Sequence, residues 1–419
     1  MGEGPAVASQ SGSAAAVPGF SATRTIRLLY GYHAFSQLQP HLALWIVYLL
    51  DFRGLTLVEV GVMEGFFWGV SLLLELPTGA FSDRFGRRLT AILASLIEAV
   101  GIVAFAFAGS FEALLFAYLF WSAGIAFRSG NSEAMLYDAL NSASRSAQYS
   151  RFQGRTTAIG TSAVMVGGVI GAALAAATNL QLPIMLGAIP SVASAVVALW
   201  LREPPRQVAG RGLSYLDTLS EAMRVLRRDA ALRFIILFQV VIATAFVADF
   251  MLLQPFLLRH DVPLVFFGLF LVPTRLMGAG AALIGWRVPQ LLGGLGRAVG
   301  LGLLATSAGL AVLGIVDHIA AYAGFVLSQI AVNAIGPSIS AYINDRTDSA
   351  VRATVLSVAP LGVAAIFGVS ATLAGIVGDS SLRLAFGGFA AGILLLAGTF
   401  YLLWLRADRR SATESAAVR

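Results

Sequence analysis

The stretch that decides the fold spans residues 79–88 and reads Gly79-Ala-Phe-Ser-Asp83-Arg84-Phe-Gly86-Arg87-Arg88. It lies between two long apolar runs, and four of its residues are charged although only 12% of the 419 residues of the chain are. A short charged segment between two apolar runs is typical of a loop that joins two membrane-spanning helices on one face of a bilayer.

The composition agrees with a membrane protein. Hydrophobic residues make up 58% of the chain and the mean hydropathy is +0.80, which is too apolar for a water-soluble domain of this length. Apolar runs of about 20 residues, long enough to cross a hydrocarbon core of roughly 30 Å, predict an all-α polytopic protein with twelve transmembrane helices in two six-helix halves. The expected spans are 26–50, 57–80, 88–109, 112–138, 155–178, 182–201, 233–257, 264–287, 297–316, 319–342, 353–377 and 382–405.

The basic residues predict the orientation of these spans. All 28 are arginine, and 23 of them fall on one side of the membrane against three on the other. By the positive-inside rule the richer side is cytoplasmic, so both termini are expected in the cytoplasm of a cell whose inner, or plasma, membrane holds the protein. The net charge of +6 then reflects topology and an anionic lipid leaflet, and no nucleic-acid partner is expected.

One long polar segment divides the chain, and Pro204 and Pro205 end the sixth span before it. Leucines recur in it at helical spacing, which predicts an amphipathic helix on the membrane surface, with a flexible linker as the alternative. The expected organisation is a disordered cytoplasmic tail (1–24), an N-terminal bundle (25–201), a cytoplasmic linker (202–232), a C-terminal bundle (233–405) and a second cytoplasmic tail (406–419). Two equal halves are typical of transporters whose substrate site lies near the midplane.

The charged loop resembles the signature of the major facilitator superfamily, Gly-x-x-x-Asp-Arg-x-Gly-Arg-Arg/Lys, in position and in spacing. The matching residues are Gly79, Asp83, Arg84, Gly86, Arg87 and Arg88. The segments Glu75-Leu-Pro-Thr-Gly79 and Ser129-Gly-Asn-Ser-Glu133-Ala-Met-Leu-Tyr-Asp138 also look like a bacterial branch that contains many drug and natural-product exporters. The resemblance covers nearly the whole chain and implies a secondary transporter that works by alternating access.

Elementary chemistry suggests what this loop does. Gly79 permits close packing of helices, Gly86 permits a tight turn, and Asp83 can accept hydrogen bonds from a helix N-terminus. Contacts of this kind to the other half would exist in only one of two end states. The six signature residues are therefore expected to act as a conformational latch; plain anchoring by positive charge is the alternative.

Ionisable residues inside the spans are candidates for substrate binding or ion coupling, because a charge at membrane depth is costly. In the N-terminal half, His41 and Glu64 lie at similar depth and could form a proton site or a structural hydrogen bond. Glu98 and Arg128 also lie at matching depths, as a structural pair or as a pair that an acidic substrate opens. Near the inner end, Glu133 and Asp138 could pair with Arg151 or Arg155, which favours a gate or latch there over a binding site.

The second half is expected to hold one such pair, Asp249 in span seven and Arg275 near the middle of span eight. A central arginine is not required for folding, so Arg275 is a candidate for substrate binding or ion coupling, with a structural ion pair as the alternative.

These observations favour a transporter that exports a small organic compound or drug in exchange for protons. Uptake or facilitated transport of a small metabolite, such as an anion held by Arg128 and Arg275, is the alternative. Many antiporters of the family carry an arginine early in span four and a Gly-Pro pair in span five, and this chain has neither. A non-transporting membrane receptor or sensor is the alternative from another class. Catalytic motifs, a nucleotide loop, cysteines and metal-ligand clusters are lacking, so no enzyme activity, cofactor, metal or nucleotide is expected.

Overall fold

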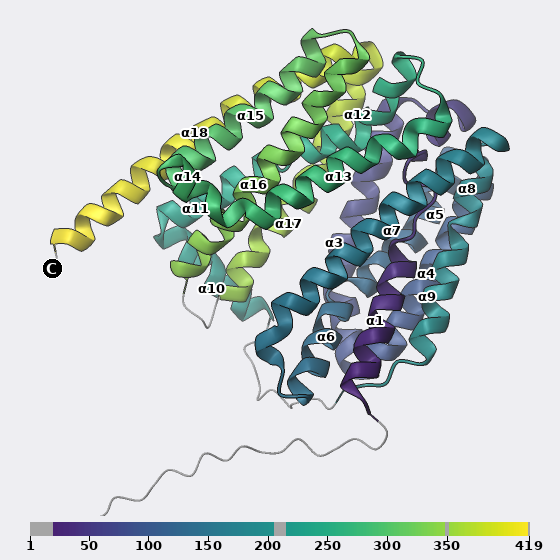
Figure 1. The fold of residues 1–419 in the computed structure, drawn as a ribbon, viewed down its shortest axis with the longest axis horizontal. Coiled ribbons are helices and arrows are strands. Elements are labelled where there is room, and N and C mark those ends of the chain that lie inside the picture. The colour runs from purple at the N-terminus through teal and green to yellow at the C-terminus, as the bar shows by residue number, and fades with distance from the viewer. Residues whose placement is uncertain (1–19, 205–214, 348–351, 418–419) are drawn as a thin grey trace, which may run out of the picture.

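The computed structural model describes residues 20–204, 215–347 and 352–417, and every regular element in these ranges is a helix. Figure 1 shows two groups of helices, α1–α9 and α11–α18, that converge toward the top of the view and diverge below. The expected all-α architecture in two halves is confirmed.

The N-terminal half contains nine α-helices and two short helical turns. Their bounds are α1 (Ala22–Gln37), α2 (Trp45–Val47), the π-helix η1 (Tyr48–Phe52), α3 (Leu57–Phe85), α4 (Arg87–Phe107), α5 (Phe111–Arg128), α6 (Asn131–Ser142), the 3-10 helix η2 (Ser146–Gln148), α7 (Tyr149–Ala177), α8 (Gln181–Leu186) and α9 (Ala188–Leu199). A Thr56–Glu59 capping box starts α3, and Gly86, with a φ of 102°, ends it.

The helix α10 (Tyr215–Arg228) follows within the expected linker. The C-terminal half then contains α11 (Ala230–Ile242), α12 (Ala245–Arg259), η3 (Leu264–Phe266), α13 (Phe267–Ile284), η4 (Gly285–Arg287), α14 (Val288–Leu292), α15 (Leu295–Ile315), η5 (Ile319–Tyr322), α16 (Ala323–Asp345), α17 (Arg352–Ser380) and α18 (Leu382–Ala417). The expected tail at residues 1–24 falls largely outside the described residues, but α1 already begins at Ala22, and α18 continues well past the expected end of the last span.

Eleven helical segments among the described residues are long and apolar enough to cross a bilayer. The expected span 26–50 is not one continuous helix, because residues 38–44 are unwound between α1 and α2. Pro40 has no N–H group and disfavours helical geometry at the residue before it, so the helix ends there. The expected span 233–257 is also interrupted, by a turn at residues 243–244 between α11 and α12.

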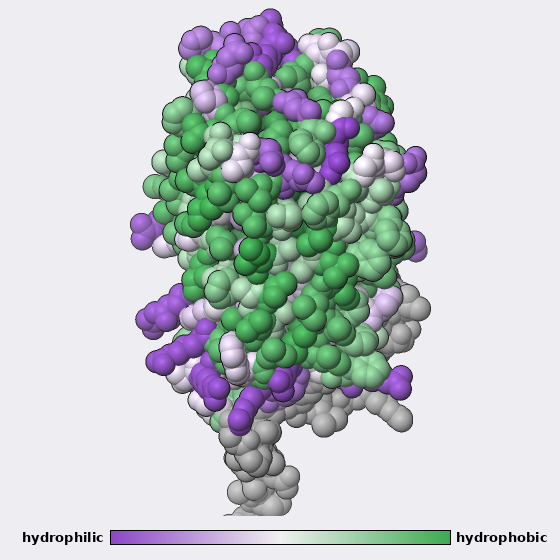
Figure 2. Space-filling model, turned by 90° about the vertical axis from the view of Figure 1, so that its right-hand side faces the viewer, coloured by the Kyte–Doolittle hydropathy of each residue, from purple (hydrophilic) through white to green (hydrophobic). Residues whose placement is uncertain are grey.

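The surface suits a bilayer. Figure 2 shows apolar side chains over most of the middle of one face, with hydrophilic residues gathered mainly toward its two ends. Below, the "termini side" means the span ends near the start of α1, near α10 and near the end of α18, and the "opposite side" means the span ends at the connections 53–56, 108–110, 178–180, 260–263 and 316–318.

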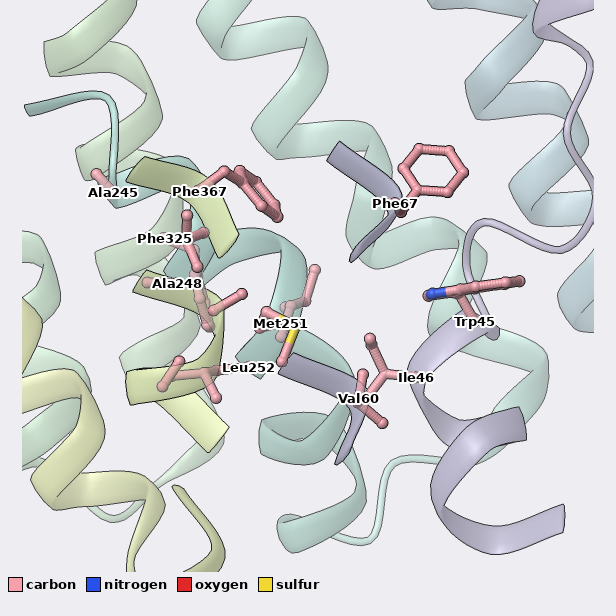
Figure 3. Close-up of a cluster of buried hydrophobic side chains, with 14 of the residues drawn as sticks. Trp45, Ile46, Val60, Phe67, Ala245, Ala248, Met251, Leu252, Phe325 and Phe367 are labelled. Carbon is pink, nitrogen blue, oxygen red and sulfur yellow. The ribbon is translucent and has the colours of Figure 1, made fainter. Parts of the chain in front are cut away.

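The halves approach each other most closely toward the opposite side. There α3 packs along α17, with Gly65 against Gly368, and α7 packs along α13, with Gly168 against Gly268. Glycines allow such backbone contact because they have no side chain to separate the helices. Figure 3 shows Met251 of α12 beside Ile46 and Val60 of the N-terminal half, so buried apolar side chains seal this part of the interface.

Candidate functional site

The unwound segment 38–44 is held by a side chain of the other half. Gln254, on α12, accepts hydrogen bonds through Oε1 from the backbone N–H groups of Ile46 (2.8 Å) and Val47 (3.1 Å). Its Nε2 donates to the carbonyl oxygen of Leu42 at 3.1 Å. Irregular backbone at membrane depth is tolerated where protein groups satisfy it or where it lines a cavity, and both conditions apply here.

Glycines of α7 make room for this segment. A side chain at Gly167 would press on the backbone of Gln39, and one at Gly171 would overlap the carbonyl group of Pro40. The run of glycines in the fifth span therefore allows the unwound chain to lie directly against α7.

A cavity of about 150 Å³ opens beside the unwound segment. Residues of the segment, of α2, α3 and α5, and one residue of α12 line it. They are Gln39, His41, Leu42, Trp45, Glu64, Phe67, Trp68, Tyr118, Trp121, Ile125 and Phe250. Six of these eleven side chains carry Phe, Tyr or Trp rings, and Glu64 is the one carboxylate among the lining residues.

Glu64 is buried, with 3% of its surface exposed. Its Oε1 accepts hydrogen bonds from Nε1 of Trp45 (3.2 Å) and from the hydroxyl of Tyr118 (3.0 Å). Both donors are neutral, and no ion pair involves Glu64 within the described ranges. This carboxyl group therefore lies at membrane depth without a positive side chain to balance it.

His41 lines the same cavity, but no hydrogen bond joins it to Glu64 among the described residues, so the expected His–Glu pair is not formed. Unwinding at Pro40 removes His41 from the helical register on which that expectation rested. Its ring instead meets the Trp121 ring edge-on, with centroids 4.9 Å apart. Its Nδ1 has no hydrogen-bond partner in the part of the chain that the structure describes and faces Gly187, where a Cβ would lie 2.5 Å from it.

Glu98 of α4 and Arg128 of α5 form an ion pair with an Nη1–Oε2 distance of 2.5 Å. Glu98 is 1% exposed, and Gly124 lets α5 approach the backbone of α4 beside it. The close approach of these two helices brings the opposite charges together, as their matching depths predict.

Asp249 of α12 and Arg275 of α13 also face each other, but loosely. Their closest atoms, Oδ2 and Nη2, lie 3.8 Å apart, and neither oxygen of Asp249 has a hydrogen-bond partner in the described part of the chain. The guanidinium of Arg275 also lies 5.5 Å from the ring centroid of Phe246. The pair contrasts with Glu98–Arg128, because its geometry leaves the buried carboxylate unsatisfied.

The signature loop is bound to its own half. Arg87 forms an ion pair with Asp138 of α6 at 2.7 Å, and its carbonyl accepts a hydrogen bond from Asn131 at 2.9 Å. Arg88 donates its backbone N–H to Glu203 (2.6 Å) and its Nη2 to the Leu199 carbonyl (2.5 Å). The loop thus joins the ends of spans two, four and six.

The remaining signature residues lie around this loop. Arg84 is exposed above the Phe85 ring, with its guanidinium 5.3 Å from the ring centroid, and Asp83 lies one turn from Gly79 near the end of α3. Among the described residues, no atom outside the neighbouring backbone of α3 itself lies within 4 Å of a Cβ built at Gly79. The close approach expected at Gly79 is therefore not present in this conformation.

The prediction that Asp138 or Glu133 pairs with Arg151 or Arg155 is wrong. Asp138 pairs with Arg87, not with Arg151 or Arg155, because α6 begins afresh after a break at residues 129–130 and points Asp138 toward α4. Glu133 has no hydrogen bond or ion pair among the described residues.

Sequence analysis missed one acid at the interface between the halves. Asp379, in the last turn of α17, accepts the backbone N–H groups of Leu57 (2.8 Å, at Oδ1) and Val58 (3.1 Å, at Oδ2) at the start of α3. A signal for it exists in the sequence: Gly375-Ile-Val-Gly-Asp379 repeats the Gly-x-x-x-Asp spacing of Gly79 and Asp83. The two motifs lie at opposite ends of the packed helices α17 and α3.

A family model described as Major Facilitator Superfamily matches residues 40–358, about three quarters of the chain. No curated protein matches it closely enough to count as a relative.

Solved structures of transporters share the fold. A mutant form of the nucleoside transporter NupG superposes with a TM-score of 0.75 at 14% sequence identity, over 91% of this chain and 100% of that one. A bacterial homologue of the human lysosomal transporter Spinster, in an inward-facing and unoccupied conformation, has a TM-score of 0.75 at 16% identity, over 92% of this chain and 97% of that one. At these identities the likeness concerns the fold.

Proposed function

The chain belongs to the major facilitator superfamily, whose members are non-enzymatic transporters of small molecules in lipid bilayers, and on this premise we propose that it exports a small organic compound in exchange for protons. It is a multi-pass membrane protein. Its place in the exporter-like bacterial branch is part of the proposal and rests on the Glu75-to-Gly79 and Ser129-to-Asp138 segments.

The proposed location is the inner membrane, with the termini side facing the cytoplasm. The support is the distribution of arginines, 23 against three, because translocation disfavours positively charged loops. The proposed moving units are the bundles 25–201 and 233–405, joined by the linker 202–232 and flanked by the cytoplasmic tails 1–24 and 406–419. In this assignment the close contacts between the halves lie on the outer side, so the conformation is inward-facing.

In the proposed cycle, rocking of the two bundles exposes the cavity beside the unwound segment to each side in turn. Two helix pairs, α3–α17 and α7–α13, would separate on the outer side as the inner side closes. The latch residues Gly79, Asp83, Arg84, Gly86, Arg87 and Arg88 would then gain partners from the other half and stabilise the outward-facing state. The Arg87–Asp138 ion pair supports this role, because it fixes the loop on its own half as one rigid unit.

One observation carries the proposal of proton coupling. Asp249 is buried, its two oxygens have no hydrogen-bond partner among the described residues, and Arg275 lies 3.8 Å away. A tightly bonded carboxylate would resist protonation. A carboxylate without hydrogen bonds, 3.8 Å from its cation, can take up and release a proton when rocking of the two bundles changes its access to water. Asp249 is therefore the proposed coupling acid and Arg275 its modulator.

The loose contact of Arg275 also supports a second candidate function. If Arg275 leaves Asp249 to bind an anionic substrate, the protein would be a carrier of small anionic metabolites. The ion pair of Arg128 with Glu98 argues against this alternative, because of the two arginines inside the spans it leaves Arg275 alone loosely paired among the described residues.

The test uses purified protein in liposomes with an imposed pH gradient and an internal pH dye. Organic cations, neutral drugs and organic anions are added one class at a time. The proposal expects proton flux that depends on a compound and that Asp249→Asn abolishes. Asp261→Asn is the matched control, because Asp261 lies in an exposed connection with a φ of 53°, a conformation that asparagine adopts readily.

Each result has a definite meaning. If compound-driven proton flux persists in Asp249→Asn, another acid carries the coupled proton and the assignment of Asp249 is contradicted. Movement of labelled anions without proton flux, lost in Arg275→Gln, would replace the export proposal by the anion carrier.

A further inference from the structure

We propose that the cavity around Glu64 binds the ammonium head group of an organic cation, which names the substrate class for the export proposed above and rests on that proposal. The inference starts from a comparison of the three buried acids of the spans. Glu98 has Arg128 at 2.5 Å and Asp249 has Arg275 at 3.8 Å, but Glu64 has no cationic side chain paired with it among the described residues.

An unbalanced carboxylate at membrane depth costs several kcal/mol, so a position of this kind is expected to serve a function. Its local geometry indicates which one. Both hydrogen bonds, from Trp45 and from Tyr118, reach Oε1. They hold the carboxylate through Oε1, and Trp68, which lies beside Glu64 in the cavity wall, has a buried indole N–H that is also available to a ligand or to the carboxylate. Oε2 receives neither of these two hydrogen bonds and is the atom proposed to meet a ligand. A cation at Oε2 would supply the missing charge.

The walls of the cavity indicate the kind of cation. Aromatic rings line it on several sides, and aromatic faces attract alkylated ammonium groups, with Trp the strongest. Trp45, Trp68 and Trp121 are half of the six tryptophans in the chain, and all three line this one cavity. An alkali-metal ion would need a shell of oxygen ligands instead.

The size of the cavity limits the ligand. Its volume is about 150 Å³, whereas pockets for whole drug-sized ligands begin at about 300 Å³. The space fits a head group such as trimethylammonium, and the rest of a larger molecule would extend from the cavity between the halves. Phe250, from α12, is the lining residue that belongs to the C-terminal half, so a bound head group contacts both moving units.

The first experiment measures binding and needs no transport. Choline is titrated into the purified protein, and binding is followed by calorimetry and by tryptophan fluorescence. The matched ligand is 3,3-dimethylbutan-1-ol, which has the shape of choline without its charge. We expect choline to bind and the neutral alcohol to bind at least roughly tenfold more weakly, as the loss of a charge-assisted contact predicts.

Three variants test the site. Glu64→Gln keeps the volume and removes the charge, and should weaken choline binding roughly 10- to 100-fold. Trp68→Phe keeps a ring but with a weaker negative face, and should weaken it a few-fold. Glu112→Gln, in the exposed first turn of the helix that also carries Tyr118, is the matched control and should bind choline as the unaltered protein does. Thermal melting of each variant shows whether it is folded. If Glu64→Gln does not fold, the choline affinity of Trp68→Phe tests the site instead.

The outcomes separate this inference from the export proposal. Choline binding that survives Glu64→Gln, or equal affinity for the neutral alcohol, would overturn the inference. So would sodium or potassium binding that depends on Glu64 and displaces choline. Proton-coupled transport of a neutral compound without choline binding would also overturn it while leaving export intact. Conversely, Glu64-dependent choline binding without proton-coupled transport would support the cation site and contradict export.

Discussion

Asp379 of the C-terminal half caps a helix of the N-terminal half: its carboxylate accepts the backbone N–H groups of Leu57 at 2.8 Å and Val58 at 3.1 Å. The first N–H groups of a helix lack partners within the helix and carry partial positive charge, so a carboxylate there is favourable. Because the donor helix α3 and the acceptor helix α17 belong to different halves, this contact exists only while the halves are closed at the side opposite the termini.

Asp379→Asn should therefore shift the protein toward the conformation that is open on that side. Loss of a charge at a helix N-terminus costs on the order of 1 kcal/mol, which changes the ratio of two states about fivefold. The chain has no cysteine, so spin labels can be placed through Ala177→Cys and Ala320→Cys, two exposed positions on that side in different halves. Double electron–electron resonance should show a larger population at long distance.

Asp317→Asn provides the control for that measurement. Asp317 lies on the same side, but its partner Arg259, at 2.7 Å, belongs to the same half, so the distances between labels should not change. Equal distance distributions for Asp379→Asn and the unaltered protein would show that the cap does not bias the two states.

A second prediction concerns the contact of α7 with α13. A Cβ at position 268 would overlap the backbone of Gly168, so Gly268→Ala should keep these helices apart and favour the same open conformation, with reduced transport. At Gly280, on the same helix, a Cβ would have no described atom outside the helix's own backbone within 4 Å, so Gly280→Ala should leave transport unchanged. The spin-label distances and the liposome assay give the two measurements. An unaltered distance distribution in Gly268→Ala would contradict the role assigned to this contact.

The sequence was sufficient for the features that depend on hydrophobicity and on charge at a given depth. Runs of apolar residues predicted the helices, and matching depths predicted that Glu98 could meet Arg128 and that Asp249 could meet Arg275. Both predictions use the fact that neighbouring spans are antiparallel and rise by about 1.5 Å per residue.

The sequence was not sufficient where the backbone leaves the helix. The prediction for His41 and Glu64 assumed one continuous helix through Pro40, and the prediction for Asp138 assumed one through Gly130. Unwinding turns a side chain away from its expected face by an amount that helical periodicity cannot give. Contacts between distant segments, such as Gln254 with Leu42 and Asp379 with Leu57, depend on how the halves meet, which a single sequence does not reveal.

A third prediction tests the signature loop. Arg87→Asp alone should place two acids together beside Asp138, loosen the loop from α6 and lower the transport rate. Arg87→Asp combined with Asp138→Arg restores opposite charges and should recover part of the rate. The pair is partly exposed, at 17% and 22% of the two side chains, so its contribution to stability is small and melting temperatures should change little. A double variant as inactive as the single one would mean that Arg87 itself, rather than the ion pair, is required.

The last prediction separates structural from functional roles for Glu98 and Arg128. Glu98 is 1% exposed and its hydrogen-bond partner is Arg128, so Arg128→Met leaves a buried carboxylate without a partner. Removing one member of a buried pair typically costs about 3–5 kcal/mol, whereas replacing both by apolar residues is often neutral. Arg128→Met should therefore lower the melting temperature, and Arg128→Met with Glu98→Leu should restore much of it. If the pair is structural, proton-coupled transport should recover with stability; a stable but inactive double variant would instead place Glu98 or Arg128 in substrate binding or coupling.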